Sequence, residues 1–387
     1  MQKDKKILLI TDTVADANGV SRFIQDMARC AYEYKVPFKV LSATSKTYCE
    51  LNPNICILKP LLRFRMPFYK ELDVAFPPYL KMTKEFKKFN PDIVHISTPG
   101  LVGFFGLCLA IWYKKPIVGT YHTNFPMYIY ENTKSNFARG TTGFFIGLFY
   151  KKFSALITRS KEYIPNISKD ISFKEEKIHV LKPGTDIKKF NSSYKDSNSW
   201  KQYDIPVNVK KFLYVGRITC EKNLDLLFSY WKEFYDKSEL KNSYLVLVGE
   251  GDLESKKEEL KDFNIRFLGH KRGEELYTLY ASSDFFVFPS ITDTLGQVVL
   301  EALACGTPAI VTTIGGPNSI LKATNNEVGF VLESNDKDAW IKIFNEIEQD
   351  SIDLKQLHIN IKKHIKNYSI ESSFENFIEI NYQVLDM

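Results

Sequence analysis

Apolar residues along the chain form short runs without polar alternation, and longer amphipathic stretches separate these runs. A run of this kind predicts a strand that is buried on both faces, as in a parallel sheet. The runs cover residues 6–11, 38–43, 93–97, 117–121, 155–159 and 178–182, then 212–216, 244–249, 265–269, 285–289, 309–312 and 329–332. Amphipathic segments such as 21–34, 224–235 and 295–304 predict helices between them. The alternation predicts an α/β protein with doubly wound, Rossmann-like sheets.

The pattern occurs twice, which predicts two domains. A chain of 387 residues also exceeds what one hydrophobic core usually serves. Residues 191–208 are rich in Ser, Asn, Lys and Asp, and we interpret them as the linker. Ligands of doubly wound sheets bind at the carboxyl ends of the strands. We therefore expect chemistry in a cleft where two such domains face each other.

Composition narrows the class of protein. Hydrophobic residues make up 44% and charged residues 25%, which is typical of a globular protein. The six cysteines are scattered without metal-site spacing, which indicates reduced thiols and a cytoplasmic location. The longest apolar run, residues 101–113, is shorter than the roughly 18 residues of a spanning helix, so it predicts a buried helix. The stretch at 7–10 is too short for the core of a signal peptide.

The net charge of +6 comes mostly from lysine clusters in the first half of the chain. No nucleic-acid-binding motif accompanies these clusters, so we expect no nucleic-acid partner. An anionic membrane surface and ordinary solvated lysine faces both remain open as explanations.

The first candidate site is a pair of acids in the second half. A predicted strand is followed by a loop with Asp293 and by a helix that is expected to begin near Leu295. The backbone N–H groups of Thr294, Leu295 and Gly296 would lack helical partners and form an anion site, to which the helix dipole adds about 0.3–1 kcal/mol. Glu301, in an otherwise apolar helix, can accept hydrogen bonds from a ribose diol. Alternatively, Asp293 is a helix N-cap and Glu301 a surface residue.

The second candidate site is a basic loop that directly follows the first strand of the second half. Arg217 and Lys222 lie five residues apart on this loop. A leaving diphosphate gains charge as its glycosidic bond breaks, and two fixed cations stabilise that charge without a metal. The alternative is a salt bridge within the loop, with Glu221 as the acidic partner.

Several motifs occur in order around these two sites and extend into the first half. They are Gly216-Arg217, Glu221-Lys222-Asn223, Leu247-Val248-Gly249-Glu250-Gly251, Phe267-Leu268-Gly269 and the two acids with seven residues between them, preceded by Thr11-Asp12-Thr13, Asn18-Gly19-Val20-Ser21-Arg22, residues 92–100, Thr120-Tyr121-His122-Thr123 and Pro183-Gly184-Thr185-Asp186 with Phe190. This ordered set resembles the retaining family 4 glycosyltransferases of GT-B fold, and the resemblance covers the whole chain. Among them it is most similar to glycolipid synthases and mannosyltransferases.

The resemblance implies roles for the donor-site residues. Arg217 and Lys222 would hold the donor diphosphate, and Glu301 would bind the ribose. Asp293 and the amides of Thr294–Gly296 would contact the sugar and the phosphates. The family commonly has Glu where this chain has Asp293, and the shorter side chain moves the carboxylate by about one methylene.

The resemblance also implies roles in the first half of the chain. His122 would lie near the transferring sugar, and Gly19 would keep the first loop close to the phosphates. Residues 1–190 would form the acceptor-binding domain and residues 209–365 the donor-binding domain. A last helix at about 366–387 would pack back on the first domain.

The implied activity is retaining, metal-independent transfer of a hexose from a nucleoside-diphosphate sugar, with UDP-sugar favoured and no cofactor. Two motifs could suggest a metal ion or a redox cofactor, but neither indicates one here. Asp336-Lys337-Asp338 has the D-x-D form of a metal site, but it precedes a helix, so N-terminal capping explains it better. Gly249-Glu250-Gly251 lacks the third glycine of a dinucleotide fingerprint, because Glu254 stands there.

The acceptor is expected to bind the first domain, where several segments are both aromatic and basic. These segments are residues 63–70, 125–130, 144–146 and 149–152. Aromatic rings flanked by Lys and Arg suit the headgroup region of an anionic membrane. We therefore expect a cytoplasmic or peripheral membrane enzyme that glycosylates a lipid such as diacylglycerol. A mobile acceptor loop with ordinary packing is the alternative interpretation of these segments.

Three other functions remain open. One is a polysaccharide or lipopolysaccharide glycosyltransferase that uses GDP-mannose or a UDP-sugar. Another is a non-catalytic scaffold subunit that binds nucleotide sugars. A nucleotide-sugar epimerase shares the architecture but would need a different acid–base set.

Overall fold

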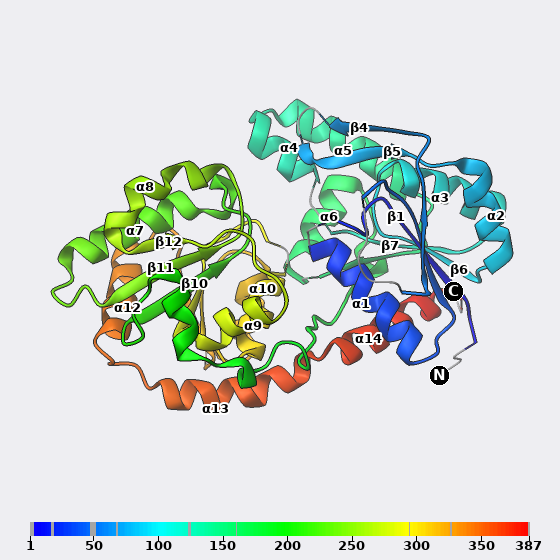
Figure 1. Ribbon diagram of the computed structural model, residues 1–387. Coiled ribbons are helices and arrows are strands. Elements are labelled where there is room, and N and C mark those ends of the chain that lie inside the picture. The colour runs from blue at the N-terminus through cyan, green and yellow to red at the C-terminus, as the bar shows by residue number, and fades with distance from the viewer. Residues whose placement is uncertain are drawn as a thin grey trace. The chain divides into compact units, whose positions relative to one another are not determined.

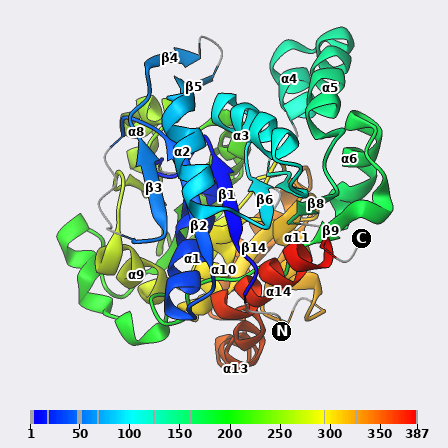
Figure 2. The same ribbon diagram turned by 90° about the vertical axis from the view of Figure 1, so that its right-hand side faces the viewer.

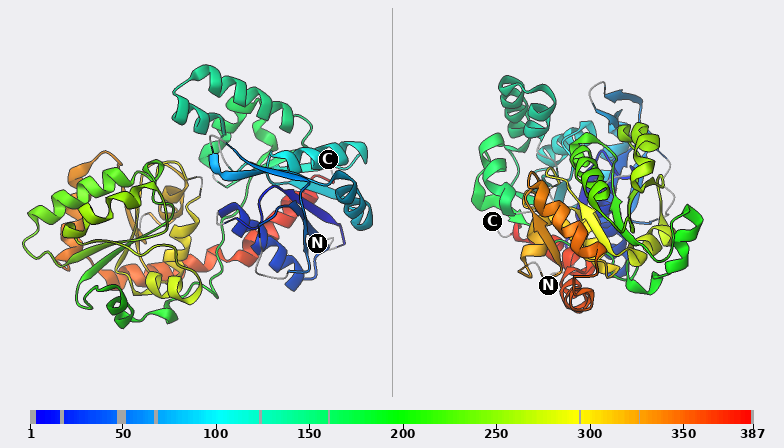
Figure 3. Two further views of the ribbon diagram at one scale, coloured as in Figure 1. Left: turned by 45° about the horizontal axis from the view of Figure 1, so that its top comes forward. Right: turned by 90° about the vertical axis from the view of Figure 1, so that its left-hand side faces the viewer.

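The computed structural model describes residues 4–16, 19–46, 52–66, 69–122, 125–159, 161–293, 295–325 and 327–385. The chain divides into two compact units (Figure 1). The first unit comprises Met1–Lys182 and Glu371–Met387, and the second comprises Pro183–Ile370. Each unit has its own parallel sheet with helices on both faces (Figure 3).

The first unit contains a seven-stranded parallel sheet in the order β3-β2-β1-β6-β7-β8-β9. Its strands are β1 (Ile7–Thr11), β2 (Phe38–Ala43), β3 (Ile55–Leu58), β6 (Ile93–Ile96), β7 (Ile117–Thr120), β8 (Ala155–Thr158) and β9 (Ile178–Val180). One face is covered by α2 (Tyr79–Phe89), α3 (Leu101–Trp112) and α6 (Ile164–Ile171), and the other by α1 (Gly19–Glu33) and α14 (Ile370–Gln383) (Figure 2). Helices α4 (Phe125–Thr133) and α5 (Asn136–Tyr150) form a hairpin, and β4 (Leu62–Met66) and β5 (Tyr69–Phe76) form an antiparallel ribbon.

The second unit contains a six-stranded parallel sheet in the order β12-β11-β10-β13-β14-β15. Its strands are β10 (Lys210–Val215), β11 (Ser243–Val248), β12 (Ile265–Phe267), β13 (Phe285–Phe288), β14 (Ala309–Thr312) and β15 (Gly329–Leu332). Its α-helices are α7 (Leu224–Lys237), α8 (Lys257–Leu260), α9 (Gly273–Ser282), α10 (Gln297–Ala304), α11 (Gly316–Lys322), α12 (Lys337–Glu348) and α13 (Leu354–His364). The core is rich in aromatic rings: that of Phe212 packs edge-on against Trp231 at 5.1 Å and against Phe344 at 5.4 Å.

The strands that were predicted from apolar runs are confirmed, each to within about three residues at its ends. The D-x-D segment also behaves as predicted, because the Asp336 side chain accepts a hydrogen bond from the Ala339 amide and caps α12. Strand β3 and the β4–β5 ribbon were not predicted. Strand β3 is an edge strand of four apolar residues, ICIL, which are only half-buried.

The interpretation of residues 191–208 as a linker is wrong. This segment belongs to the second unit and forms the short 3₁₀ helices η3 (Ser192–Tyr194) and η4 (Ser197–Tyr203). Trp200 in η4 is fully buried, and its indole N–H donates to the carbonyl oxygen of Ser282 at 3.1 Å. Ile205 is also buried in this core, so a few apolar side chains anchor a segment whose other residues are mostly polar.

The C-terminal helix α14 belongs to the first unit and is attached through a buried hydrogen-bond network. Asn381 uses its amide nitrogen to donate to the Phe377 carbonyl oxygen at 2.7 Å, which turns its amide oxygen toward His95. His95 Nδ1 therefore donates to Asn381 Oδ1 at 2.9 Å, and its Nε2 accepts from the Thr120 hydroxyl at 2.8 Å. This arrangement requires the neutral form of His95, and burial lowers the pKa of its imidazole to about 4.

Candidate functional site

The loop after β10 is held close to the loop after β11. The Gly216 amide donates to the Val248 carbonyl oxygen at 3.0 Å, and the Tyr214 hydroxyl donates to the Arg217 carbonyl oxygen at 2.8 Å. A Cβ on Gly249 would lie 1.9 Å from the Gly216 carbonyl oxygen, so only glycine permits this approach. The backbone of the loop with Arg217 and Lys222 is therefore fixed by its neighbours.

Both predicted cations of this loop lie in ion pairs. Lys222 Nζ lies 2.7 Å from Asp293 Oδ2, which also accepts a hydrogen bond from the Ser290 hydroxyl at 2.5 Å. Arg217 pairs with Glu221, which is the salt bridge within the loop that was considered as the alternative for this residue. The structure thus brings Lys222 and Asp293 together, and each of the two cations has an acidic partner.

Helix α10 begins later than predicted. We expected a start near Leu295, but Gly296 has a left-handed backbone with φ of +72° and the helix begins at Gln297. A Cβ on Gly296 would lie 2.5 Å from Pro317 Cγ, so glycine is required there on both grounds. Leu295 is buried in the core of the second unit. Thr294 lies outside the described residues.

Glu301 is buried, with a relative exposure of 2%, so the alternative of a surface residue is wrong. The Tyr280 hydroxyl from α9 donates to Glu301 Oε2 at 3.1 Å. A buried carboxylate needs donors around it. Sequence reasoning missed both Tyr280 and Ser290, because neither position differs in pattern from an ordinary core or loop residue.

His122 follows β7 in the first unit. Its Nε2 lies 2.8 Å from the Ser97 hydroxyl oxygen, and its ring packs edge-on against Phe23 at 5.7 Å. The pKa of His122 is held well below its usual value, first by burial and then by the charge of Arg159 and by His95. The side chain is therefore a neutral hydrogen-bonding group at neutral pH. A neutral imidazole suits a hydrogen bond to a sugar hydroxyl better than a role as general acid.

Two further residues mark the amino-terminal loop of the first unit. Gly19 is the first residue of α1, and a Cβ there would have no atom of this structure within 4 Å. Asp12, which directly follows β1, accepts hydrogen bonds from the Val102 and Gly103 amides at 2.8 and 3.2 Å and so caps α3. Burial raises the pKa of Asp12, although these hydrogen bonds oppose the shift. The motif that contains Asp12 does not reveal this capping role.

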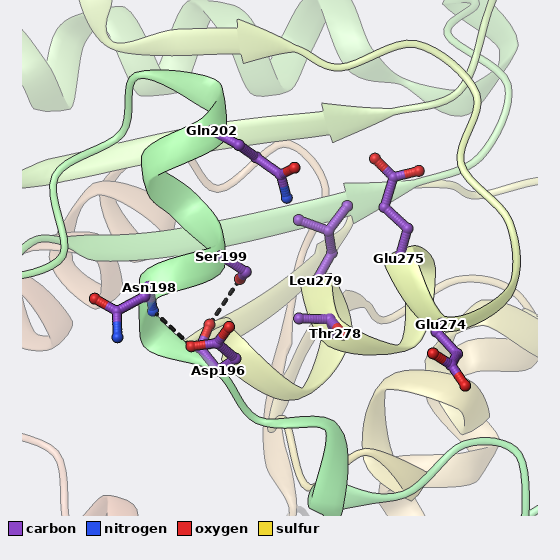
Figure 4. A pocket seen from close by; sticks show the side chains of 8 residues that line it. All are labelled: Asp196, Asn198, Ser199, Gln202, Glu274, Glu275, Thr278 and Leu279. Carbon is purple, nitrogen blue, oxygen red and sulfur yellow. Dashed lines mark hydrogen bonds between the residues drawn. The ribbon is translucent and has the colours of Figure 1, made fainter.

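A pocket of about 470 Å³ lies elsewhere in the second unit, between η4 and α9 (Figure 4). Asp196, one of its lining residues, already has hydrogen-bond partners: its carboxylate accepts from the Asn198 amide at 2.9 Å, and its carbonyl oxygen accepts from the Ser199 hydroxyl. None of the predicted site residues line this pocket. Asp196 caps η4 and Glu275 is bonded to Tyr203 and Lys271, so we do not consider this pocket as the functional site.

Two features are absent from the part of the chain that the structure describes. No group of three or more His, Cys, Asp or Glu side chains there is placed to hold a metal ion. No helix within those ranges has the length and apolar character needed to cross a membrane.

Two family models match the chain in succession. Residues 17–189 match the model described as Glycosyltransferase Family 4, and residues 196–364 match the one described as Glycosyl transferases group 1. The first match lies mostly in the first unit and the second match lies in the second unit, where it includes the loops with Arg217, Lys222 and Asp293.

Curated relatives give a consistent result. The chain is 30% identical to sulfoquinovosyl transferase SQD2 of Arabidopsis thaliana, over 70% of this chain and 53% of that protein. It is 28% identical to a GDP-mannose-dependent alpha-mannosyltransferase of Mycobacterium tuberculosis, over 66% and 64%. It is 29% identical to the UDP-Gal:alpha-D-GlcNAc-diphosphoundecaprenol alpha-1,3-galactosyltransferase of Escherichia coli, over 70% of each protein. The matches thus span about half to 70% of the length of these curated relatives.

Solved structures support the fold. Sucrose-phosphate synthase from Thermosynechococcus elongatus superimposes with a TM-score of 0.75 over 99% of both chains, at 17% sequence identity. At this identity the likeness concerns the fold alone, and it agrees with two Rossmann-like units in one chain.

Proposed function

We propose, from the membership of this chain in the family 4-like glycosyltransferases of GT-B fold, that it transfers a hexose from a nucleoside-diphosphate sugar to a hydroxyl group of a membrane lipid. The observation that best supports the proposal is the pairing of Lys222 with Asp293 at 2.7 Å beside the start of α10. This pairing places a lysine and the amides of a helix start in one region of the second unit. Both groups suit a diphosphate.

In the proposed donor complex, the diphosphate takes the place of the acidic partners in the free protein. Lys222 would turn from Asp293 to a phosphate oxygen, and Arg217 would turn from Glu221. The released Asp293 carboxylate is then available to a sugar hydroxyl. The buried Glu301 would accept hydrogen bonds from the ribose diol.

The proposed reaction retains the configuration at the anomeric carbon. The bond between the anomeric carbon and the β-phosphate oxygen breaks, and a bond from this carbon to the acceptor oxygen forms on the same face. The acceptor proton passes to the leaving phosphate oxygen, so no side chain is needed as general base. Arg217 and Lys222 stabilise the growing charge on the diphosphate, and we therefore propose that no metal ion is required.

For the donor we favour a UDP-sugar, and for the acceptor a lipid such as diacylglycerol. The Escherichia coli relative, by its name, uses UDP-Gal and acts on a diphosphoundecaprenol-linked sugar. Large apolar side chains are also exposed on the first unit, among them Phe64 (50%), Phe104 (50%) and Phe144 (68%). Exposed aromatic residues of this kind suit contact with a lipid.

One alternative is supported by a specific finding. The Mycobacterium tuberculosis relative is named as GDP-mannose-dependent, so a GDP-mannose donor and a glycan acceptor form the second candidate function. A non-catalytic scaffold subunit that binds nucleotide sugars is the third candidate, and the transfer assay described below separates it from the two enzymes.

The test is thermal-shift screening against UDP, GDP and ADP, with and without EDTA. A nucleotide at 100 times its dissociation constant stabilises the folded protein by about 2.7 kcal/mol, which is readily measured. We expect stabilisation by UDP that is unaffected by EDTA and is lost in the Arg217→Ala, Lys222→Ala double variant. The matched control for the loss of two positive charges is Lys237→Ala with Lys257→Ala, since both lysines are exposed on the second unit.

Each other outcome has a defined meaning. Stabilisation by GDP alone would favour the mannosyltransferase alternative, and loss of the effect in EDTA would overturn metal independence. Stabilisation by a nucleotide without any transfer of sugar would support the scaffold subunit, and no stabilisation by any nucleotide would overturn the proposed donor site. If UDP binds, transfer from UDP-glucose or UDP-galactose to dispersed diacylglycerol tests the acceptor, and anomer analysis of the product by NMR tests retention.

A further inference from the structure

A second pocket, of about 860 Å³, lies within the first unit, between α5 and the segment from α6 to β9. Figure 2 shows α5 and α6 side by side, at the edge of the unit near β8 and β9. The volume falls within the roughly 300–1,000 Å³ of typical small-molecule sites. None of the residues assigned to the donor site line this pocket.

Glycines on α5 create the close helix approach that shapes the pocket. A Cβ on Gly143 would lie 2.4 Å from the Asp170 carbonyl oxygen, and a Cβ on Gly147 would lie 2.6 Å from that of Ile171. Any larger residue at either position would push α6 away. Gly140, one turn earlier, also lines the pocket, but a Cβ there has no atom within 4 Å. The pocket thus has space beside Gly140, whereas α5 and the end of α6 are in close contact at Gly143 and Gly147.

The lining is strongly cationic. Lys151, Lys169, Lys174 and Lys177 line it together with Arg139. The one carboxylate in the lining, Asp170, is already paired with Arg139 at 2.7 Å, and its side chain is only 6% exposed.

The charge of these lysines is largely uncompensated. Among the described residues, no ion pair involves Lys151, Lys169 or Lys177. Lys174 forms a long ion pair, with its Nζ 3.6 Å from Oε1 of the highly exposed Glu176. The pocket therefore presents unpaired positive charge from three separate segments of the chain. Such a concentration of ammonium groups suits a phosphate group.

An apolar stripe runs along α5 beside the pocket. Phe137, Phe144 and Leu148 follow the spacing of one helix face, and their exposures are 82%, 68% and 57%. Phe144 and Leu148 also line the pocket, with Phe153 and Phe173 at its base. A ligand that bound here would contact lysines at one end and an exposed hydrocarbon surface at the other.

We propose that this pocket binds the phosphate headgroup of an anionic phospholipid in a bilayer, while the exposed stripe of α5 enters the interfacial region. The apolar stripe favours a bilayer lipid rather than a free phosphate ester as the ligand. A soluble anion would leave Phe137, Phe144 and Leu148 exposed to water, whereas a bilayer would cover them. The inference rests on the proposed function, since an enzyme with a lipid acceptor must work at a bilayer surface. It adds a defined phospholipid site, separate from the donor site.

The test is flotation of the full-length protein with vesicles of phosphatidylcholine alone and of phosphatidylcholine with 30% phosphatidylglycerol, a composition that supplies roughly −30 mV of surface potential or more. We expect binding to the anionic vesicles, weakening as salt is raised. Replacing Lys151, Lys169, Lys174 and Lys177 by Gln should weaken binding at least tenfold. The matched control replaces the exposed Lys81, Lys84, Lys87 and Lys88 of α2 by Gln, with the same change in charge.

A second variant tests the pocket without removing a lysine. Gly140→Glu places a carboxylate in the pocket with room for its side chain, and we expect at least a tenfold loss of vesicle binding. Gly140→Gln has nearly the same shape without the charge, and it should bind within about threefold of the original protein. Circular dichroism melting of each variant checks that the fold is kept.

The outcomes that overturn the proposal are distinct. Equal losses for the pocket and α2 variants would show diffuse electrostatic attraction. Full binding by Gly140→Glu would show that the pocket is not used. Glycerol phosphate that competes with vesicles at millimolar concentration would show a site for soluble phosphate esters. UDP stabilisation, measured without vesicles, reports the donor site separately, so the failure of one proposal does not imply failure of the other.

Discussion

Lys222 and Asp293 form an ion pair of 2.7 Å although 71 residues separate them in the sequence. The pair joins the loop after β10 to the loop after β13, at the carboxyl ends of two neighbouring strands of the second unit. Its side chains are 12% and 25% exposed, so a ligand can reach both. If a diphosphate competes with Asp293 for the lysine, the two residues should respond differently to substitution.

Lys222→Met should weaken UDP binding about 10- to 150-fold, because a hydrogen bond to a charged group contributes about 1.5–3 kcal/mol. Asp293→Asn keeps a group that can accept from Ser290 but removes the charge that competes for Lys222. We therefore expect Asp293→Asn to bind UDP as tightly as the original protein or more tightly, with slower sugar transfer. Isothermal titration calorimetry measures the first effect and steady-state kinetics the second. Equal weakening by both substitutions would indicate that the ion pair only holds the two loops together.

A second prediction concerns the buried Glu301. Glu301→Gln retains the shape and the contact with Tyr280 but loses the negative charge that would attract a ribose diol. We expect about tenfold weaker binding of UDP, and little change for 2′,3′-dideoxy-UDP, which lacks the diol. Tyr280→Phe, which removes one donor to the carboxylate, should have a smaller effect on both ligands. A Glu301→Gln variant that binds UDP and its dideoxy analogue with unchanged affinity would contradict the ribose role.

The sequence predicted the two sheets because parallel strands that are buried on both faces leave continuous apolar runs. It also placed Arg217, Lys222, Asp293 and Glu301 on the second unit, through local motifs that follow strands. It could not predict the Lys222–Asp293 pair or the start of α10. These features depend on residues that are distant in the sequence. For example, Pro317 lies so close to Gly296 that a Cβ on Gly296 would be 2.5 Å from Pro317 Cγ.

The linker error has the same origin. Composition averaged over residues 191–208 is polar, but the buried side chains of Trp200 and Ile205 anchor the segment on the second unit. The α5–α6 pocket was not predicted either, because its lysines come from segments up to 26 residues apart and share no motif. Their convergence depends on the close approach at Gly143 and Gly147, which a sequence pattern does not reveal.

A third prediction separates a functional glycine from a structural one. Gly19→Ala adds a Cβ that would have no atom from elsewhere in the described residues within 4 Å, so the melting temperature should stay the same or rise slightly. If the loop lies close to the donor phosphates, as proposed, kcat/KM should nonetheless fall at least fivefold. Gly249→Ala is the matched contrast: its Cβ would lie 1.9 Å from the Gly216 carbonyl oxygen, at a φ of +142°. We expect it to lose about 2 kcal/mol of stability or more. Unchanged kinetics in Gly19→Ala would remove Gly19 from the donor site.

The last prediction concerns acid stability and His95. Its pKa is about 4 in the folded protein because the imidazole is buried, whereas an exposed histidine titrates near 6.5. Between these values the unfolded chain binds the proton and the folded chain does not. The stability from the neutral ring is therefore complete above pH 6.5, and it is lost as the pH falls toward 4, by about 3 kcal/mol in all.

Urea unfolding at pH 7.5 and pH 4.5 measures this loss. His95→Gln cannot take up the proton, so its unfolding midpoint should fall less between the two pH values, even if it starts lower. His270→Gln, at an exposed position, is the matched control and should keep the full pH dependence. If His95→Gln shows the same acid loss as the original protein, other groups must be responsible, and the bond from His95 to Asn381 would be only a neutral attachment for α14.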